Sequence, residues 1–121
     1  MNDPILEIRD FARYIRIDYK DVVDFGKQKR MLDMIHGMYL DKGVRKFIVN
    51  AKGCRVNYSI LERHKIGEYV AEKFKTHIIF ACIIDAEQLT GIVENTSHNR
   101  GGTGLKIVTT EQEALDWIGE R

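Results

Sequence analysis

Residues 77–84 read HIIFACII, and the part from Ile78 to Ile84 is the longest apolar run in the chain. This run is too short to cross a membrane, which takes about 18 apolar residues, but it has the length of a strand. A strand without polar alternation is covered on both faces, as in a parallel sheet flanked by helices. The run therefore predicts a buried strand within such a sheet.

Segments with alternating strand and helix patterns lie on both sides of this run. Strand patterns occur at 5–9, 14–19, 46–50 and 105–109, and helical patterns at 24–42, 59–74, 85–96 and 110–118. We expect residues 51–57 to form a loop. The alternation implies parallel pairing, whereas the two closely spaced N-terminal strands favour an antiparallel hairpin. We predict an α/β fold, a mixed sheet of about five strands with about four helices on both faces or mainly on one.

Capping residues indicate where several helices begin or end. Ser59 is followed three residues later by Glu62, which is the pattern of a capping box. Thr110 and Glu113 repeat the same spacing. Gly43 follows the first helical pattern and is a good C-cap, because glycine adopts a positive φ without strain.

Length and charge limit the class of protein. The 121 residues contain no internal repeat and fit a single domain, 1–121. The chain has 19 basic and 18 acidic residues, a balance that argues against binding nucleic acid by bulk electrostatics. The N-terminal MNDPILE has no signal-peptide pattern, and no segment is long and apolar enough for a membrane span. We expect a cytoplasmic protein, in which Cys82 is a buried apolar residue and Cys54 a free thiol in a loop.

The sequence contains none of the familiar motifs of phosphate binding, nucleophilic catalysis or metal binding. It has no Gly-x-x-x-x-Gly-Lys-Ser/Thr, no Gly-x-Gly-x-x-Gly and no Gly-x-Ser-x-Gly. The glycine-rich stretch 100–104 precedes a strand rather than a helix, so we expect it to be a tight connection. The four histidines lie in separate elements without ligand spacing. We therefore expect no metal, no cofactor and no enzymatic activity.

The segment Asn57-Tyr58-Ser59 stands between the strand pattern at 46–50 and the second helical pattern. Open α/β sheets bind ligands beyond the carboxyl ends of their strands. A phosphate on Ser59 would also be stabilised by the N-terminus of the helix. Asn57, Tyr58 and Ser59 are therefore a candidate phosphorylation or partner site. The alternative is that Ser59 only caps the helix.

Three further side chains are candidate anion contacts. Arg63 and His64 lie one turn beyond Ser59 on the same predicted helix, and Arg100 borders the glycine-rich turn. Each could place a positive charge or a hydrogen-bond donor beside an anion. The alternative is that all three are solvated surface residues.

The order of elements resembles the STAS fold, the anti-anti-sigma-factor-like domain, and in particular the bacterial single-domain STAS-like proteins grouped with CRAL-TRIO-type lipid-transfer domains. The resemblance covers the chain from about residue 13. It is carried by the segments RHKIGEYVA (63–71), HIIFACII (77–84), ENTSHNRG (94–101) and EALDWI (113–118). In anti-anti-sigma factors, a partner kinase phosphorylates a serine at the start of the helix after the central strand. The resemblance places Ser59 there, although the family's Asp-Ser-Ser/Thr-Gly is replaced by Tyr58-Ser59-Ile60-Leu61.

Three classes of function follow. The leading class is a non-enzymatic regulatory or protein-interaction module with a protein partner. The second is a binder of a small apolar or lipid-like ligand, which needs a cavity under the second and third helices, and the third is a small enzyme of unknown reaction. We also expect a homodimer, formed through the N-terminal edge and through Met31, Met38 and Tyr39, unless these three side chains belong to the core.

Overall fold

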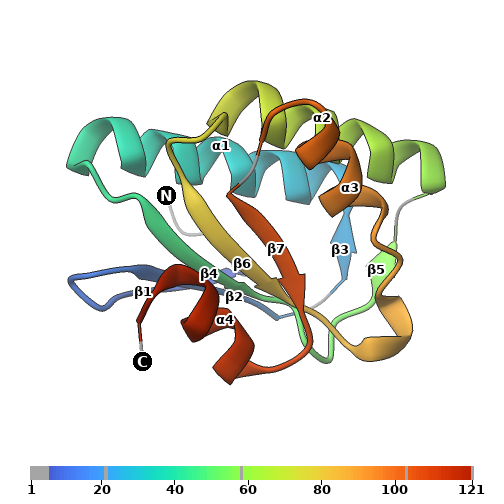
Figure 1. Cartoon of the computed structure of the whole chain (residues 1–121). Coiled ribbons are helices and arrows are strands. Elements are labelled where there is room, and N and C mark those ends of the chain that lie inside the picture. The colour runs from blue at the N-terminus through green and yellow to red at the C-terminus, as the bar shows by residue number, and fades with distance from the viewer. Residues whose placement is uncertain (1–5, 21, 58, 103, 121) are drawn as a thin grey trace.

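The computed structural model describes residues 6–20, 22–57, 59–102 and 104–120. A five-stranded sheet with the strand order β1-β2-β4-β6-β7 forms its centre (Figure 1). The strands are β1 (Leu6–Asp10), β2 (Ile15–Tyr19), β4 (Lys46–Asn50), β6 (Ile79–Ile83) and β7 (Leu105–Val108). The last four pair in parallel, and β1 is antiparallel to β2. The predicted mixed sheet with an antiparallel N-terminal hairpin is confirmed.

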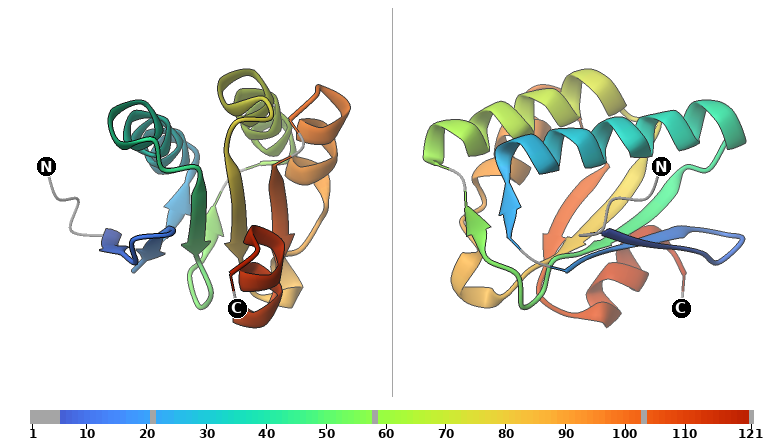
Figure 2. Two further views of the ribbon diagram at one scale, coloured as in Figure 1. Left: turned by 60° about the vertical axis from the view of Figure 1, so that its left-hand side comes forward. Right: turned by 180° about the vertical axis from the view of Figure 1, so that it is seen from behind.

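Helices cover both faces of the sheet. The four α-helices are α1 (Phe25–Lys42), α2 (Ile60–Phe74), α3 (Ile92–Asn99) and α4 (Glu111–Ile118). The first three lie on one face and α4 lies on the other (Figure 2). Phe47 and Val49 pack toward the first three helices, and Ile48 packs toward α4. All three are fully buried, so both faces of β4 are covered.

The apolar run from Ile78 to Ile84, which predicted a buried strand, contains β6. Phe80 faces the core under α1 and α2, whereas Ala81 and Ile83 face the core under α4. Ile78 and Ile84, just outside β6, are also buried. The absence of polar residues in this run therefore reflects burial on both faces of the sheet.

Two short strands correct the expectation of a loop at 51–57. β3 (Val23–Asp24) and β5 (Val56–Asn57) pair in parallel as a separate ladder. The Val23 N–H also donates to the Arg55 carbonyl at 2.8 Å. Because β3 leads directly into α1 and β5 lies just before α2, this ladder holds the starts of the two helices side by side. Two-residue strands carry no periodicity, which is why the sequence did not indicate them.

The third predicted helix, 85–96, is wrong in its boundaries. Residues Ala86–Gln88 form a short 3₁₀ turn, and α3 begins only at Ile92. Gly91, with φ of 76°, separates the two. A left-handed residue cannot continue an α-helix, so Asp85 precedes a short turn and not the helix. Its carboxylate does not cap the turn and accepts the Gly53 N–H at 2.9 Å.

The predicted capping residues are confirmed. The Ser59 hydroxyl accepts the Glu62 N–H at 3.1 Å, and the Glu62 carboxylate accepts the Ser59 N–H at 2.8 Å. The Thr110 hydroxyl accepts the Glu113 N–H at 3.2 Å. Gly43 ends α1 with φ of 71°.

Among the described residues, no helix combines the length and the apolar character that a membrane span requires.

The apolar patch proposed for a dimer on α1 is not a patch. Met31 is fully buried in the main core, and Met38 and Tyr39 are half-buried and pack against it. These side chains face the sheet because α1 is amphipathic and turns its apolar stripe inward. The sequence left open whether these three side chains form a dimer surface or belong to the core, and the structure supports the core.

Candidate functional site

The start of α2 lies beyond the sheet, beside the ladder of β3 and β5 (Figure 1). Asn57 is exposed in β5 and stands opposite Asp24, which caps α1. Ser59 is exposed at the N-cap of α2. Tyr58, the third residue of the predicted site, lies outside the described residues. The structure therefore places Asn57 and Ser59 together at the paired starts of two helices.

Apolar side chains adjoin the capped serine. Ile60 is 66% exposed and Leu61 is 63% exposed, although both belong to the first turn of α2. Their exposure follows from the helix phase, because Ile66 and Val70 supply the buried face of α2. The sequence analysis did not identify this pair.

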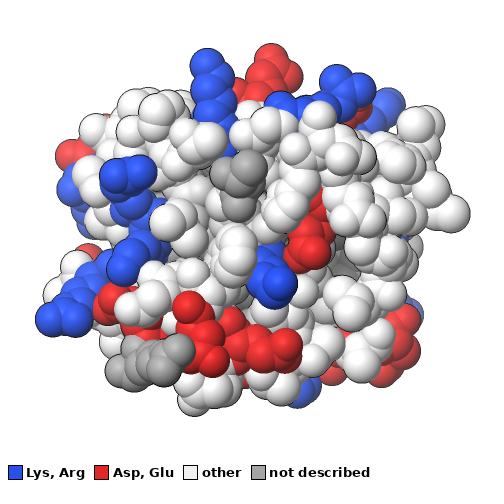
Figure 3. Space-filling model, viewed as in Figure 1, with Lys and Arg blue, Asp and Glu red and all other residues white. Residues whose placement is uncertain are grey.

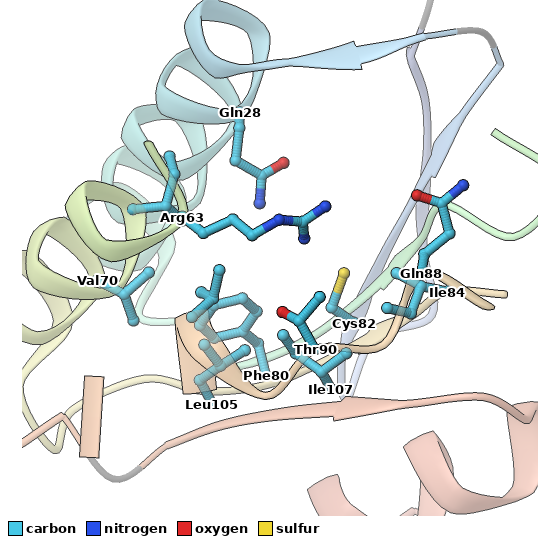
Figure 4. Close-up of a pocket in the computed structure, with 12 residues that line it drawn as sticks. Gln28, Arg63, Val70, Phe80, Cys82, Ile84, Gln88, Thr90, Leu105 and Ile107 are labelled. Atoms are coloured by element: carbon cyan, nitrogen blue, oxygen red, sulfur yellow. The ribbon is translucent and has the colours of Figure 1, made fainter. Parts of the chain in front are cut away.

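Arg63 and the walls of a cavity lie beneath the first turns of α2. Figure 4 shows the Arg63 side chain extending across this cavity, with the Gln28 and Gln88 side chains around it and the Cys82 thiol below. The cavity has a volume of about 30 Å³. Its apolar lining comes mainly from Ile66, Val70, Phe80, Val93, Leu105 and Ile107. It lies under α2 and α3, where the sequence analysis required a cavity for an apolar ligand, and its volume corresponds to about one water molecule.

The two cysteines are not activated nucleophiles. Burial raises the pKa of the Cys82 thiol to about 12, so the thiol stays protonated at neutral pH. Cys54 forms no disulfide and is buried in the loop after β4, where its thiol lies 3.3 Å from the Tyr19 carbonyl oxygen. The buried Cys54 is not accessible to a substrate, and the protonated Cys82 thiol is a poor nucleophile.

The other predicted anion contacts are not gathered around Ser59. The His64 Nδ1 atom lies 2.9 Å from the Thr96 hydroxyl oxygen, which links α2 to α3. Arg100 forms an ion pair with Glu68 at 2.6 Å. Glu68 is about two and a half helical turns beyond Ser59, so Arg100 lies well away from the start of the helix. Of the three candidates, only Arg63 reaches the space below the first turn of α2.

An ion-pair network that the sequence analysis missed lies on the α4 face of the sheet. Arg16 donates two hydrogen bonds to Glu111, at the start of α4, and also bonds Asp18 at 3.2 Å. Asn50 donates to Asp18 at 2.9 Å. The Arg16 and Asp18 side chains are only 11% and 15% exposed. Their alternation with Ile15 and Ile17 was a signal that both lie on the opposite face of β2.

Ionisation of Asp18 reflects opposing influences. Burial disfavours the carboxylate, but hydrogen bonds from Asn50, Arg9 and Arg16 outweigh burial, and the pKa of Asp18 lies below its usual value. The ion pair between Arg16 and Glu111 holds α4 on the sheet.

Among the described residues, no three His, Cys, Asp or Glu side chains are grouped so as to hold a metal ion.

The sheet has four parallel strands and an antiparallel edge, and helices cover both of its faces. This architecture is that of a STAS-like α/β domain. No protein-family model matches the chain, and no curated protein matches it. A solved structure matches 93% of this chain and 91% of its own, with a TM-score of 0.50 and 13% sequence identity. It is described as an uncharacterised protein from the DUF3478 family with a SpoIIAA-like fold, from Shewanella loihica PV-4. The chain thus has a SpoIIAA-like, STAS-like fold, as predicted.

Proposed function

We propose that this protein is a non-enzymatic regulatory module that binds a partner protein through the start of α2. The observation that carries the proposal is the exposure of Ile60 and Leu61 beside the capped Ser59. The right-hand side of the face in Figure 3, where α2 begins, is mostly uncharged, although the first two turns of α2 also carry Glu62 and Lys65. Burying apolar side chains contributes about 25 cal/mol per Å², so a partner that covers this pair would gain stability.

The STAS-like fold supports a regulatory role at the same position. In the anti-anti-sigma factors that the chain resembles, the serine at the start of this helix is the phosphorylated residue. We propose that Ser59 serves both as a helix cap and as a phosphorylation site. The Glu62 carboxylate stays within 2.8 Å of the Ser59 N–H, so a phosphate there would repel it. Phosphorylation would therefore open the capping box and add charge to the docking surface.

Variants of Ser59 test this proposal. Ser59→Asp adds a negative charge and should release the partner, whereas Ser59→Ala adds no charge and should retain it. The measurement is partner recovery with each variant, together with phosphoproteomics of the protein from its native cells. Detection of phosphate on Ser59, together with loss of the partner from the Ser59→Asp variant, would support a regulatory site at Ser59. Equal partner recovery by the wild type and both variants would leave Ser59 a cap only.

The competing functions have less support. A cavity of about 30 Å³ is far below the roughly 300–1,000 Å³ of small-molecule pockets, so an apolar ligand would require α2 and α3 to separate. Native mass spectrometry after mild purification tests this alternative, because a co-purified lipid would favour it. For an enzyme, the described groups near Ser59 that could act as a general base are already engaged, since His64 contacts Thr96 and the Glu62 carboxylate accepts the Ser59 N–H. We also propose a cytoplasmic location, which is supported by the reduced state of Cys54 and Cys82, neither of which forms a disulfide.

A further inference from the structure

A second hollow lies at the end of α2 remote from Ser59, between α2 and the second half of α1. Figure 2 shows these two helices side by side. Its volume is about 460 Å³, within the range of small-molecule sites. The side chains that line it are His36, Tyr69, Glu72, Lys73, Lys75 and His77. All are polar or charged, in contrast to the apolar pair at Ser59.

Cationic groups outnumber carboxylates around this hollow. Lys73 is engaged by Asp33 at 3.0 Å, and Asp33 also accepts a hydrogen bond from the Tyr69 hydroxyl. Lys75 is exposed and forms no ion pair with a described residue. Arg45 is held at the edge, where its Nε donates to the His77 carbonyl at 2.8 Å. Among the lining side chains, the cations Lys73 and Lys75 outnumber the one carboxylate, Glu72. The Lys29 Nζ atom lies 5.0 Å from the Tyr69 ring and adds a further positive charge opposite Asp33, so the hollow keeps an excess of positive charge.

The two histidines add unused hydrogen-bonding groups. The Tyr39 ring lies between them, with centroids 6.2 Å from His36 and 6.1 Å from His77. His36 also stacks on Phe74 at 6.4 Å, so both rings are fixed by aromatic neighbours. Their ring nitrogens form no hydrogen bond to any residue that the structure describes. They are therefore available to an anion in the hollow.

Lys75 occupies a backbone conformation that lysine rarely adopts. Its φ is 51° and its ψ is −118°, at the second position of the turn closed by the His77 N–H and the Phe74 carbonyl at 2.9 Å. These angles match the position of a type II′ turn that glycine normally fills. A lysine there is strained, and local strain of this kind is concentrated at functional sites. The strain is explained if the ammonium group serves a ligand.

We propose that this hollow binds a small, soluble phosphate monoester, with Lys75 as its principal cation. A phosphate monoester carries nearly two negative charges and three acceptor oxygens, which suits an ammonium group and two imidazoles on separate elements. The site is independent of partner binding at Ser59, because it lies at the opposite end of α2.

The test is a titration of the full chain with inorganic phosphate, followed by amide NMR at constant ionic strength. Saturable shifts should appear at residues 36 and 75–77. Lys75→Gly should weaken phosphate binding about tenfold, since one charge-assisted contact is lost, whereas Lys75→Arg should retain it. Lys65→Ala, on the exposed face of α2, is the matched control and should bind as the wild type does.

Stability provides an independent readout. Lys75→Gly should raise the melting temperature by about 2–5 °C, because glycine relieves the positive φ. A variant that is both more stable and weaker in binding is the result expected of a strained ligand-binding residue. Unchanged phosphate binding by Lys75→Gly, or a lower melting temperature, would overturn the proposal. The protein could instead sediment with phosphatidic acid vesicles in a manner that depends on Lys75, while showing no saturable binding of free phosphate. That result would overturn the assignment to a soluble ligand.

Discussion

Ser59 shows how one side chain can serve both the fold and the function. Its hydroxyl accepts the Glu62 N–H, so Ser59→Ala should lower the free energy of unfolding by about 0.5–2 kcal/mol. Ser59→Asp should keep wild-type stability, because aspartate also caps and its charge favours the helix N-terminus. Urea denaturation of the three proteins measures the difference. An alanine variant as stable as the wild type would show that the cap contributes nothing.

The lowered pKa of Asp18 should make the free energy of unfolding depend on pH at the acidic end of the range. Its pKa is below the usual value in the folded state, against about 3.9 for an unfolded aspartate. The stabilising effect is therefore complete above about pH 4 and is lost as the pH falls through the folded pKa. Asp18→Asn should be less stable than the wild type at pH 7 and should lose less stability on acidification. Urea denaturation between about pH 2 and pH 7 checks this, and parallel curves for the two proteins would contradict it.

Local patterns predicted single residues well when the partner was close in the chain. The Ser59 and Thr110 caps involve residues three apart, although only Ser59 and Glu62 form a full capping box, and Gly43 ends its own helix. The pairing of Arg16 with Glu111 joins residues 95 apart, and only the parallel sheet brings them together. The exposure of Ile60 depended on the phase of α2, which its short apolar pattern did not fix.

At the scale of elements, the contact between α2 and α3 depends on Gly67. A Cβ atom at this position would lie 2.6 Å from the Val93 carbonyl oxygen and 2.7 Å from the Thr96 Cβ atom. Gly67→Ala should therefore push the helices apart and cost about 1–3 kcal/mol of stability.

The matched control for Gly67 is Gly37 in α1, where an added Cβ would have no heavy atom within 4 Å. Gly37→Ala should stabilise the protein by about 0.5–1 kcal/mol, because alanine is the better helix former. Thermal unfolding of both variants compares the two effects. Equal shifts in the same direction would mean that close packing at Gly67 is unimportant.

The sequence predicted the long elements and missed the short ones. The strands and helices with several periods of apolar residues are confirmed, whereas the ladder of β3 and β5 has two residues in each strand. The break at Gly91 was missed because an acidic residue at position 85 resembled a helix start. These two features decide how α2 begins and how α3 packs, so the surroundings of the candidate site were the least predictable part of the fold.

At the scale of the molecule, β1 is the remaining basis for the predicted homodimer. It is an edge strand of the sheet, and it presents Ile8 at 40% exposure, while Phe11 just beyond it is 45% exposed. Unpaired edges of this kind associate readily. Light scattering should detect a dimer at high micromolar concentration, and Ile8→Lys should convert it to a monomer. A wild-type protein that is monomeric at that concentration would contradict the prediction.

The start of α2 is the surface on which we propose that a partner protein docks. Ile60 and Leu40 are both 66% exposed, but Ile60 belongs to that surface and Leu40 lies near the end of α1. The most direct measurement compares the proteins recovered from native cell extract by the wild type, Ile60→Glu and Leu40→Glu, each shown by circular dichroism to be folded. We expect a partner that is retained by the wild type and by Leu40→Glu and is lost by Ile60→Glu. Identical recovery by all three proteins would contradict it.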